Sequence, residues 1–342
     1  MPLSRRIRLA RRPQGELQPA DFSAVVEPVE PLAVGEARLA NRYLSIDPAI
    51  RGWMSEGASY MAPITLGGVM RSAALSEVVE VRGHPRLRVG QVVVGLSGWE
   101  DFSRVGPDFV GRILPDDRSL PLTSALSVLG GNGLTAWFGM NEIGQPKPGE
   151  TVLVSAAAGG VGSIAGQLAR LAGCRVIGLA GTDEKVAWLT GELGFDAGIN
   201  YKTAREGEGI YAAIRAVSPR GVDVFFDSVG GDILDAGLGT IRVGARVVIC
   251  GAISQINATT LPPGPANYIR LLTRRARMQG FVTLDYADRW QEASNQLAQL
   301  VLSGKLRHRE HIVDGLLQAP AALIGILRGE NLGKMMVRVG TA

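Results

Sequence analysis

The chain has 342 residues, with 36 Lys+Arg against 32 Asp+Glu and only two cysteines. That length exceeds the roughly 250–300 residues at which one hydrophobic core stops growing, so two domains are expected. Apolar residues make up 46% of the chain, but no apolar run reaches the ~20 residues of a membrane span or forms a secretory signal near the start, so we expect a folded protein with no membrane partner.

The densest basic run is an N-terminal segment with five arginines, at residues 5–12. These arginines alternate with apolar residues as in an edge strand, and no aromatic residues lie between them to stack on bases, so we expect no nucleic-acid partner. The two cysteines, Cys174 and Cys250, are too few for a four-cysteine zinc lobe or a disulfide framework. The sequence therefore predicts a reduced, cytoplasmic protein.

The first 120 residues favour short strands broken by turns. Alternating or continuous apolar segments at residues 37–47, 74–83 and 89–98 are bounded by Gly, Pro or Asp. Few helical stretches interrupt these segments. The sequence therefore predicts a compact β domain in this part of the chain.

The pattern changes near residue 123, where helical segments begin to alternate with buried-looking strands. The predicted strands cover residues 151–156, 174–180, 222–229, 245–252 and 278–284. Between the first two, Ile164, Leu168 and Leu171 share one face of a helix. Alternation of this kind indicates a doubly wound parallel sheet with right-handed crossovers. Near the C-terminus, strands at 306–315 and 333–340 flank a helix at 319–329 and could return to the first domain.

The turn after the strand at 151–156 is rich in glycine, with Gly159, Gly160 and Gly162 leading into the helix. A strand, a glycine turn and a helix N-terminus together offer free N–H groups and a favourable dipole to an anion. The turn lacks the first glycine of the G-x-G-x-x-G fingerprint, so a tight turn of any α/β protein is the alternative. The flanking strand and helix favour a dinucleotide site.

The residues at the end of the next strand indicate whether the cofactor carries a 2′-phosphate. NAD binders place a carboxylate there for the ribose 2′-hydroxyl, about 20 residues after the glycine turn. Here the chain has Gly181 and Thr182, with no carboxylate until Asp183, and Lys185 follows. Thr182 could donate to a 2′-phosphate and Lys185 could supply a cation, which favours NADP(H). The alternative is an ordinary solvated lysine on an exposed helix.

At this point the chain resembles the medium-chain dehydrogenase/reductase superfamily, and in particular its zinc-independent branch of prostaglandin, leukotriene, curcumin and alkenal double-bond reductases. The resemblance rests on SIDPAIRGWM (45–54), GLTAWFG (133–139), AAAGGVGSIAGQLARLAGCRVIG (156–178), GTDEKVAWL (181–189), GFDAGINYKT (194–203), FDSVGG (226–231), CGAIS (250–254), LPPGP (261–265), ARMQGF (276–281) and ENLGK (330–334). It implies a GroES-like β-rich catalytic domain of residues 1–126 and 305–342, a Rossmann NADP-binding domain of residues 127–304, and a homodimer.

The resemblance also implies a set of cofactor-binding residues. Gly159, Gly160, Val161 and Gly162 would hold the pyrophosphate, and Lys185 and Tyr201 would meet the 2′-phosphate. Others would line the rest of the site: Ser228, Cys250, Gly251, Ala252, Ile253, Ser254, Phe281, Val282, Thr283 and Asn331. Three positions depart from the pattern of many relatives, Ser228 (Asn there), Asn132 (Pro) and Ala49 (Tyr), which affects the expected substrate range more than the cofactor.

No metal site is expected. Zinc-dependent relatives carry a Gly-His-Glu segment near residue 70, where this chain has Gly67-Gly68-Val69-Met70-Arg71. The three histidines are His84, beside a proline in a predicted turn, and His308 and His311, expected at a surface or strand end. Alcohol oxidation without zinc loses its Lewis acid, whereas reduction of a conjugated alkene needs only a hydride donor and a hydrogen-bond donor for the carbonyl oxygen.

The implied activity is the NADPH-dependent reduction of the C=C bond of α,β-unsaturated aldehydes and ketones. A tyrosine suits the donor role because its pKa near 10 keeps it protonated at neutral pH. Tyr268, after the segment PPGPAN, and Tyr60, in the loop SYMAP, lie in loops expected at the cleft, and either could instead shape the pocket wall. An NADPH-dependent quinone oxidoreductase and a non-catalytic NADPH-binding protein are the alternative functions.

Overall fold

The computed structural model describes residues 2–57, 59–117 and 119–340. The chain divides into two compact units. Unit 1 comprises residues 1–126, 310–331 and 335–342, and unit 2 comprises residues 127–309 and 332–334. The sequence predicted domain boundaries after residue 126 and after residue 304. The three residues 332–334 join unit 2 because they pair with its glycine turn, as described below.

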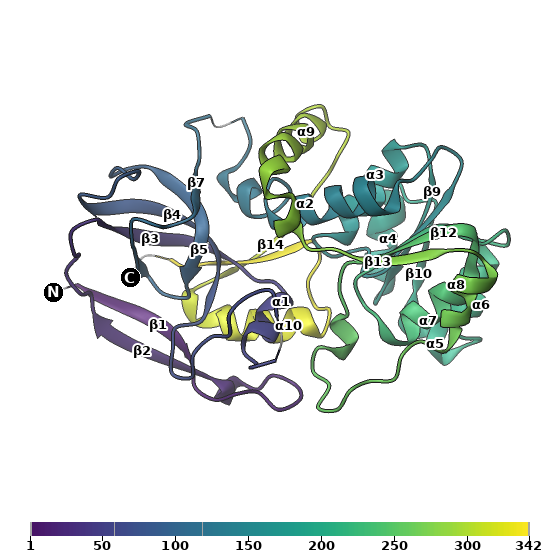
Figure 1. The fold of residues 1–342 in the computed structure, drawn as a ribbon, viewed down its shortest axis with the longest axis horizontal. Coiled ribbons are helices and arrows are strands. Elements are labelled where there is room, and N and C mark those ends of the chain that lie inside the picture. Colours follow the sequence, from purple (N-terminus) through teal and green to yellow (C-terminus); the bar gives the residue numbers. More distant parts are fainter. Residues whose placement is uncertain (1, 58, 118, 341–342) are drawn as a thin grey trace. The chain divides into compact units, whose positions relative to one another are not determined.

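Unit 1 is built mainly from β-strands (Figure 1). The strands are β1 (Leu3–Leu9), β2 (Phe22–Pro28), β3 (Glu36–Ser45), β4 (Arg71–Arg82), β5 (Val92–Gly98), β6 (Phe102–Val105), β7 (Gly111–Ile113), β14 (Glu310–Asp314) and β15 (Lys334–Arg338). The largest sheet has the order β14-β15-β3-β4-β5-β7, with β6 paired to β3. The C-terminal strands therefore join the N-terminal sheet, as the sequence suggested they could.

Strands β1 and β2 form a separate antiparallel pair, and β1 contains the first arginines of the basic N-terminal run. These arginines are neutralised by acidic neighbours: Arg5 pairs with Asp101 at 2.7 Å, and Arg6 and Arg8 both contact Glu27. The prediction of a strand is confirmed. Helices α1 (Ala49–Trp53) and α10 (Ala319–Leu327) complete the unit, and α10 packs into a core shared with β1 and β15.

Unit 2 is a six-stranded parallel sheet of order β10-β9-β8-β11-β12-β13, covered by helices (Figure 1). The strands are β8 (Thr151–Val154), β9 (Arg175–Ala180), β10 (Ala197–Asn200), β11 (Val222–Asp227), β12 (Ile241–Ile249) and β13 (Arg277–Gly280). The helices are α2 (Gly131–Phe138), α3 (Gly162–Leu171), α4 (Asp183–Gly191), α5 (Tyr201–Glu206), α6 (Ile210–Val217), α7 (Gly231–Thr240), α8 (Ile269–Thr273) and α9 (Trp290–Leu302). This confirms the predicted doubly wound fold.

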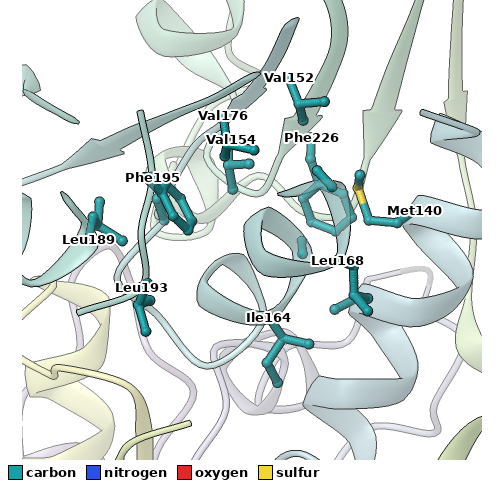
Figure 2. Close-up of a cluster of buried hydrophobic side chains, with 14 of the residues drawn as sticks. Met140, Val152, Val154, Ile164, Leu168, Val176, Leu189, Leu193, Phe195 and Phe226 are labelled. Atoms are coloured by element: carbon teal, nitrogen blue, oxygen red, sulfur yellow. The ribbon is translucent and has the colours of Figure 1, made fainter. Parts of the chain in front are cut away.

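The central strands β8 and β11 are buried on both faces, because helices cover the sheet and successive side chains of a strand point to opposite faces. Val152, Val154 and Phe226 pack on one face with Ile164 and Leu168 of α3 (Figure 2). The alternate residues of the same strands belong to a second cluster on the other face. The helix prediction needs one correction: Leu171, the last residue of α3, is 44% exposed, and the buried residues of this helix end at Ala169.

Several predicted strand boundaries were wrong, and one strand of the unit 2 sheet was missed. β12 begins at Ile241 rather than at residue 245. β13 ends at Gly280 rather than at residue 284, because the following residues turn into a short 3-10 helix (Thr283–Arg289). The missed strand, β10, has only four residues, one of them glycine, and pairs with β9 from Ala197 to Asn200. A strand of four residues is too short to show a clear alternation of apolar and polar residues in the sequence.

Candidate functional site

The carboxyl ends of six parallel strands lie along one edge of the unit 2 sheet. The strand order reverses between β8 and β11, and ligands of doubly wound folds bind at this point outside the carboxyl ends. The predicted cofactor residues of unit 2 directly follow these strands: Gly159, Gly160, Val161 and Gly162 after β8; Thr182 and Lys185 after β9; Tyr201 after β10; Ser228 after β11; Cys250, Gly251, Ala252, Ile253 and Ser254 after β12; and Phe281, Val282 and Thr283 after β13. Asn331 lies in unit 1.

The glycine turn is held too tightly for larger residues. A Cβ atom at Gly162 would lie 2.5 Å from the carbonyl oxygen of Ala156 and 2.9 Å from the Cα of Ala157. A Cβ at Gly160 would lie 3.1 Å from Asn132 Nδ2. These glycines are needed for close approach, because the left-handed residue of the turn is Ala156, with φ of 45°. At the start of the ten-residue helix α3, the N–H groups of Ser163 and Ile164 donate to the carbonyls of Gly159 and Val161, so an anion here would be held by the turn before them and by the positive end of the helix dipole.

A C-terminal segment, residues 332–334, is bonded to the glycine turn. The N–H of Gly333 donates to the carbonyl of Ala158 at 2.8 Å, and Gly159 and Gly333 form an isolated β-bridge. The Cα of Lys334 lies 3.3 Å from the position of a Cβ on Gly160. Asn132, which the sequence singled out as a departure at the pocket wall, therefore lies against the glycine turn together with this segment.

The ends of β9 and β10 bring three predicted residues together. Ala180 and Asn200 are paired in register, so the turns that follow them are neighbours. A Cβ at Gly181 would lie 3.0 Å from the hydroxyl of Tyr201, and Thr182 caps α4 by accepting from the N–H of Lys185 at 3.3 Å. The nearest carboxylate in sequence, Asp183, accepts from the Asn200 amide at 2.8 Å.

Sequence reasoning missed a second cationic side chain near the ends of β9 and β10. The guanidinium of Arg205 lies over the Tyr201 ring, 5.4 Å from its centroid. It also pairs with Asp232 at 2.6 Å, but both side chains are about half exposed, so this ion pair contributes little to stability and can rearrange. The signal available in the sequence was the spacing of Arg205 four residues after Tyr201 on one helix.

A buried carboxylate ties together the turns after β8 and β11. Asp227 is fully buried and accepts from the hydroxyl of Ser155 at 2.6 Å and from the N–H groups of Val229 and Gly230 at 3.1 and 2.9 Å. Ser155 Oγ in turn accepts from the N–H of Ser228 at 2.9 Å. Burial raises the pKa of Asp227, and these hydrogen bonds oppose that shift. Sequence reasoning did not identify Ser155 or Asp227 as site residues.

The next turn, after β12, is bonded to the same loop. The N–H of Cys250 donates to the carbonyl of Asp227, that of Ile253 to Ser228, and Ser254 Oγ donates to the carbonyl of Val229 at 2.6 Å. Desolvation raises the pKa of the Cys250 thiol to about 11, an effect that the Ser228 hydroxyl opposes. A thiol with a raised pKa is mostly protonated at neutral pH, which disfavours a nucleophilic role for Cys250.

Two observations test whether this edge fits a dinucleotide. The hydroxyl oxygen of Ser228 is buried, and within the described chain its neighbour is the Cys250 thiol, a weak partner with which it forms no hydrogen bond of normal geometry. A buried hydroxyl that faces only a thiol is costly, and a bound polar group would satisfy it better. The second observation is the glycine turn. A Cβ at Gly160 or Gly162 would come too close to neighbouring atoms, so the backbone of this turn stays uncovered for a ligand only with glycine there. The residues present therefore fit the cofactor predicted from the sequence.

The tyrosines separate into packed and accessible ones. Tyr286 stacks on Phe138 with centroids 4.6 Å apart, and the Tyr43 hydroxyl accepts from Arg338. The two predicted donors, Tyr268 and Tyr60, are 62% and 57% exposed. Tyr268 lies in unit 2 and Tyr60 in unit 1.

The segment before Tyr268 is fixed to α7. Asn267 donates to Asp235 through both its backbone N–H, at 2.7 Å, and its side-chain amide, at 3.0 Å. Tyr268 was expected in a loop, but it is the last residue of a short 3-10 helix (Ala266–Tyr268), which is anchored one residue before the phenol while the Tyr268 side chain is exposed.

The histidines show no metal-binding arrangement in the described part of the chain. Within residues 2–57, 59–117 and 119–340, no three His, Cys, Asp or Glu side chains gather in a way that could hold a metal ion. His84 is buried, and its ring nitrogens contact the Gly106 carbonyl and the N–H groups of Arg86 and Leu87. His308 and His311 are half-buried.

Comparison with known proteins places this architecture in a family. Residues 5–112 match the family described as the N-terminal domain of oxidoreductase, and residues 160–299 match the family described as zinc-binding dehydrogenase. The NADPH-dependent curcumin reductase of Escherichia coli is 42% identical over 98% of this chain and 97% of its own length. The chain belongs to the medium-chain dehydrogenase/reductase superfamily.

Two further proteins, one compared by sequence and one by structure, are also similar to this chain over most of its length. The NADP(+)-dependent 2-alkenal reductase of Nicotiana tabacum is 38% identical, over 87% of this chain and 86% of its own length. The crystal structure of CurA from Vibrio vulnificus in complex with NADPH superimposes with a TM-score of 0.92 at 40% identity, over 99% of this chain and 100% of that one. The resemblance read from the motifs is confirmed. The described residues include no helix long and apolar enough to cross a membrane.

Proposed function

We propose that this enzyme uses NADPH to reduce the C=C bond of α,β-unsaturated aldehydes and ketones. Support comes from the names of its relatives, a curcumin reductase and a 2-alkenal reductase, which are similar along nearly the whole chain. The observation that carries the proposal is the carboxyl edge of the unit 2 sheet, where the glycine turn and the carboxylate-free end of β9 fit a phosphorylated dinucleotide.

The phosphates of the cofactor would be held at two places. The turn Gly159–Gly162 and the positive end of the α3 dipole suit the pyrophosphate. Lys185, Thr182 and Tyr201 would surround the 2′-phosphate, and Arg205 would supply a second cation by leaving its weak pair with Asp232. When bound, NADPH supplies the hydride that reduces the β-carbon of the substrate.

The chain's own contribution to the chemistry is a hydrogen-bond donor for the substrate. As the β-carbon gains a hydride, negative charge moves to the carbonyl oxygen, and a tyrosine hydroxyl would stabilise it before the α-carbon takes up a proton. We propose Tyr268 as the preferred donor and Tyr60 as the second candidate, since both side chains are exposed and neither lies inside a long helix or a strand. The reaction needs no metal, because a phenol can serve where zinc polarises the carbonyl in dehydrogenases.

The proposal is tested by product analysis. Incubation with NADPH and a medium-chain 2-enal should consume the reduced cofactor and yield the saturated aldehyde. An allylic alcohol as the product would show carbonyl reduction instead and contradict the proposal. A simple quinone, assayed in parallel, distinguishes a quinone oxidoreductase, which would turn it over faster than the enal, and a lack of turnover with all acceptors would indicate a non-catalytic NADPH-binding protein.

We also propose that the enzyme is a cytoplasmic homodimer that continues its sheet through β13. This strand is at the edge of the unit 2 sheet, all four of its residues are exposed, and an exposed edge presents unpaired N–H and C=O groups to a second copy. Light scattering of the purified protein measures its mass. Proline is poorly tolerated in a paired strand, so Gln279→Pro should favour the monomer, and a wild-type monomer at all concentrations would contradict the proposal.

A further inference from the structure

A cavity of about 280 Å³ lies at the amino end of β13, the opposite end of this strand from the predicted cofactor residues 281–283. All of its lining residues belong to unit 2. Four of them are cations: Arg246 of β12, its register partner Arg277 of β13, Arg275 just before β13, and Lys147 in the loop before β8. None of the described residues that line the cavity is a carboxylate.

Two carboxylates near the cavity are already paired with arginines. Glu150 accepts from Nη1 and Nη2 of Arg246 at 2.8 and 2.6 Å, and Asp223 accepts from Arg242 at 2.9 Å. Lys147 interacts with Glu150 electrostatically but forms no ion pair with it in the described chain. The charge of Arg246 is therefore compensated within the fold, whereas the other three cations of the cavity lack such a partner.

These three cations have hydrogen-bond donors to spare. Within residues 2–57, 59–117 and 119–340, the side chains of Lys147 and Arg275 form no hydrogen bond or ion pair, and both residues are exposed. Arg277 uses only Nη2, which donates to the Ile143 carbonyl at 2.8 Å and to the Gln145 side chain at 3.1 Å, so its Nε and Nη1 remain for a ligand. Like charges that converge on one cavity repel one another, and a bound anion would replace this repulsion by attraction.

The backbone at two positions of the cavity is strained. Three residues of the described chain other than glycine have a left-handed conformation, and two of them line this cavity: Gln145, with φ of 45°, and Arg275, with φ of 48°. Each follows the end of a helix (Gly139–Gly144 and α8, respectively), where glycine is the usual left-handed residue. The third, Ala156, is at the glycine turn of the proposed cofactor site. Such strain gathers at ligand sites, so side chains retained at these two positions indicate a ligand here too.

We propose that this cavity binds a diphosphate group, at a site separate from the cofactor edge and independent of the proposed activity. Lys147, Arg275 and the unused N–H groups of Arg277 donate to the phosphate oxygens in charge-assisted hydrogen bonds. None of the described lining residues is aromatic, so the cavity recognises the phosphates and not an attached base. A Cβ at Gly244, another lining residue, would meet no atom within 4 Å, which leaves room for the anion beside the backbone.

The test is calorimetric titration of sodium diphosphate into the enzyme saturated with NADP⁺, which keeps the diphosphate from the cofactor edge. The wild type should bind it, and added salt should weaken the binding. Loss of charge-assisted hydrogen bonds in Arg275→Gly should weaken binding by about 10-fold to 100-fold. The thermal unfolding midpoint of this variant without diphosphate should be no lower than that of the wild type, because glycine adopts the left-handed conformation without strain. Weaker binding by Arg275→Gly would then not be caused by unfolding.

Two further variants separate the cavity from the net charge of the protein. Arg275→Lys keeps the charge and should retain part of the affinity. Arg215→Gln makes the same change of net charge as Arg275→Gly, at an exposed residue of α6 outside the cavity, and should bind diphosphate as the wild type does. No binding by the wild type at low salt, equal binding by the wild type and Arg275→Gly, or an equal loss in Arg215→Gln and Arg275→Gly would overturn the proposal.

Cytidine 5′-diphosphate, titrated in parallel, distinguishes the two sources of a diphosphate group. Binding as tight as that of the inorganic ion, and equally sensitive to Arg275→Gly, supports a site for the diphosphate end of a larger molecule. Much weaker binding supports a site for free inorganic diphosphate. Tight binding of the nucleotide that Arg275→Gly leaves unchanged would place the nucleotide elsewhere and contradict recognition through the cations of this cavity.

Discussion

Substitution of Gly162 by alanine tests the role of the glycine turn most directly. The added Cβ would lie 2.5 Å from the Ala156 carbonyl oxygen and 2.9 Å from the Ala157 Cα, and both atoms belong to the backbone. Since neither atom can rotate away, the start of α3 must shift. Overpacking of this kind costs about 1–3 kcal/mol of unfolding free energy. The shift also displaces the N–H groups that would bind the pyrophosphate.

Two measurements on Gly162→Ala check this reasoning. Chemical denaturation should show the loss of stability, and fluorescence titration should show weaker binding of NADPH and NADH alike, because both cofactors share the pyrophosphate. Gly191→Ala is the matched control: Gly191 ends α4, and nothing lies within 4 Å of its Cβ position. That variant should be unchanged or more stable by about 0.5–1 kcal/mol. Normal NADPH affinity in Gly162→Ala would refute the assignment of the turn.

Three further outcomes are expected. Lys185→Ala should weaken NADPH binding by about 10-fold or more and leave NADH binding nearly unchanged, and equal losses for both would contradict the 2′-phosphate assignment. Tyr268→Phe should lower kcat more than it raises the KM of the enal, and unimpaired turnover would remove Tyr268 from the mechanism. Asp227 has a raised pKa in the folded state, so the stability of the wild type relative to Asp227→Asn should be highest below about pH 3.8 and fall as pH rises, and a pH-independent difference in denaturation midpoint would argue against this shift.

The fold could be predicted from the sequence wherever the signal is local. The strands at the centre of unit 2 are continuous apolar runs, and the face of α3 that contains Ile164 and Leu168 shows helical spacing. β10 escaped notice because its four residues carry too little pattern, and its place beside β9 depends on pairing between residues 20 positions apart, such as Ala180 and Asn200. Leu171 fits the helical period yet is exposed, because spacing alone does not show where a helix stops touching the sheet.

The candidate site was predictable in its motifs but not in the contacts that hold it together. Thr182, Lys185 and Tyr201 were named from the sequence, and their grouping follows from the register of two parallel strands. Arg205 lies over the Tyr201 ring, and its spacing four residues after Tyr201 on one helix was a local signal that sequence reasoning overlooked. Asn132 lies against Gly160 only through folding, and this contact has no signature in a single sequence because it joins segments that no local rule connects.

The hydrogen bonds around Asp227 explain how this site can be rigid before any ligand binds. Ser155 and Asp227 are 72 residues apart, and their bond of 2.6 Å joins the turns on either side of the point where the strand order reverses. Because Asp227 is fully buried, water cannot replace a donor that moves away, so each of the three donors is held in place by the cost of leaving a buried carboxylate unsatisfied. The turn after β12 is bonded in the same way to the carbonyls of Asp227, Ser228 and Val229. A cofactor that binds at this edge would therefore meet loops that are already ordered, and the free energy of binding need not be spent on ordering them.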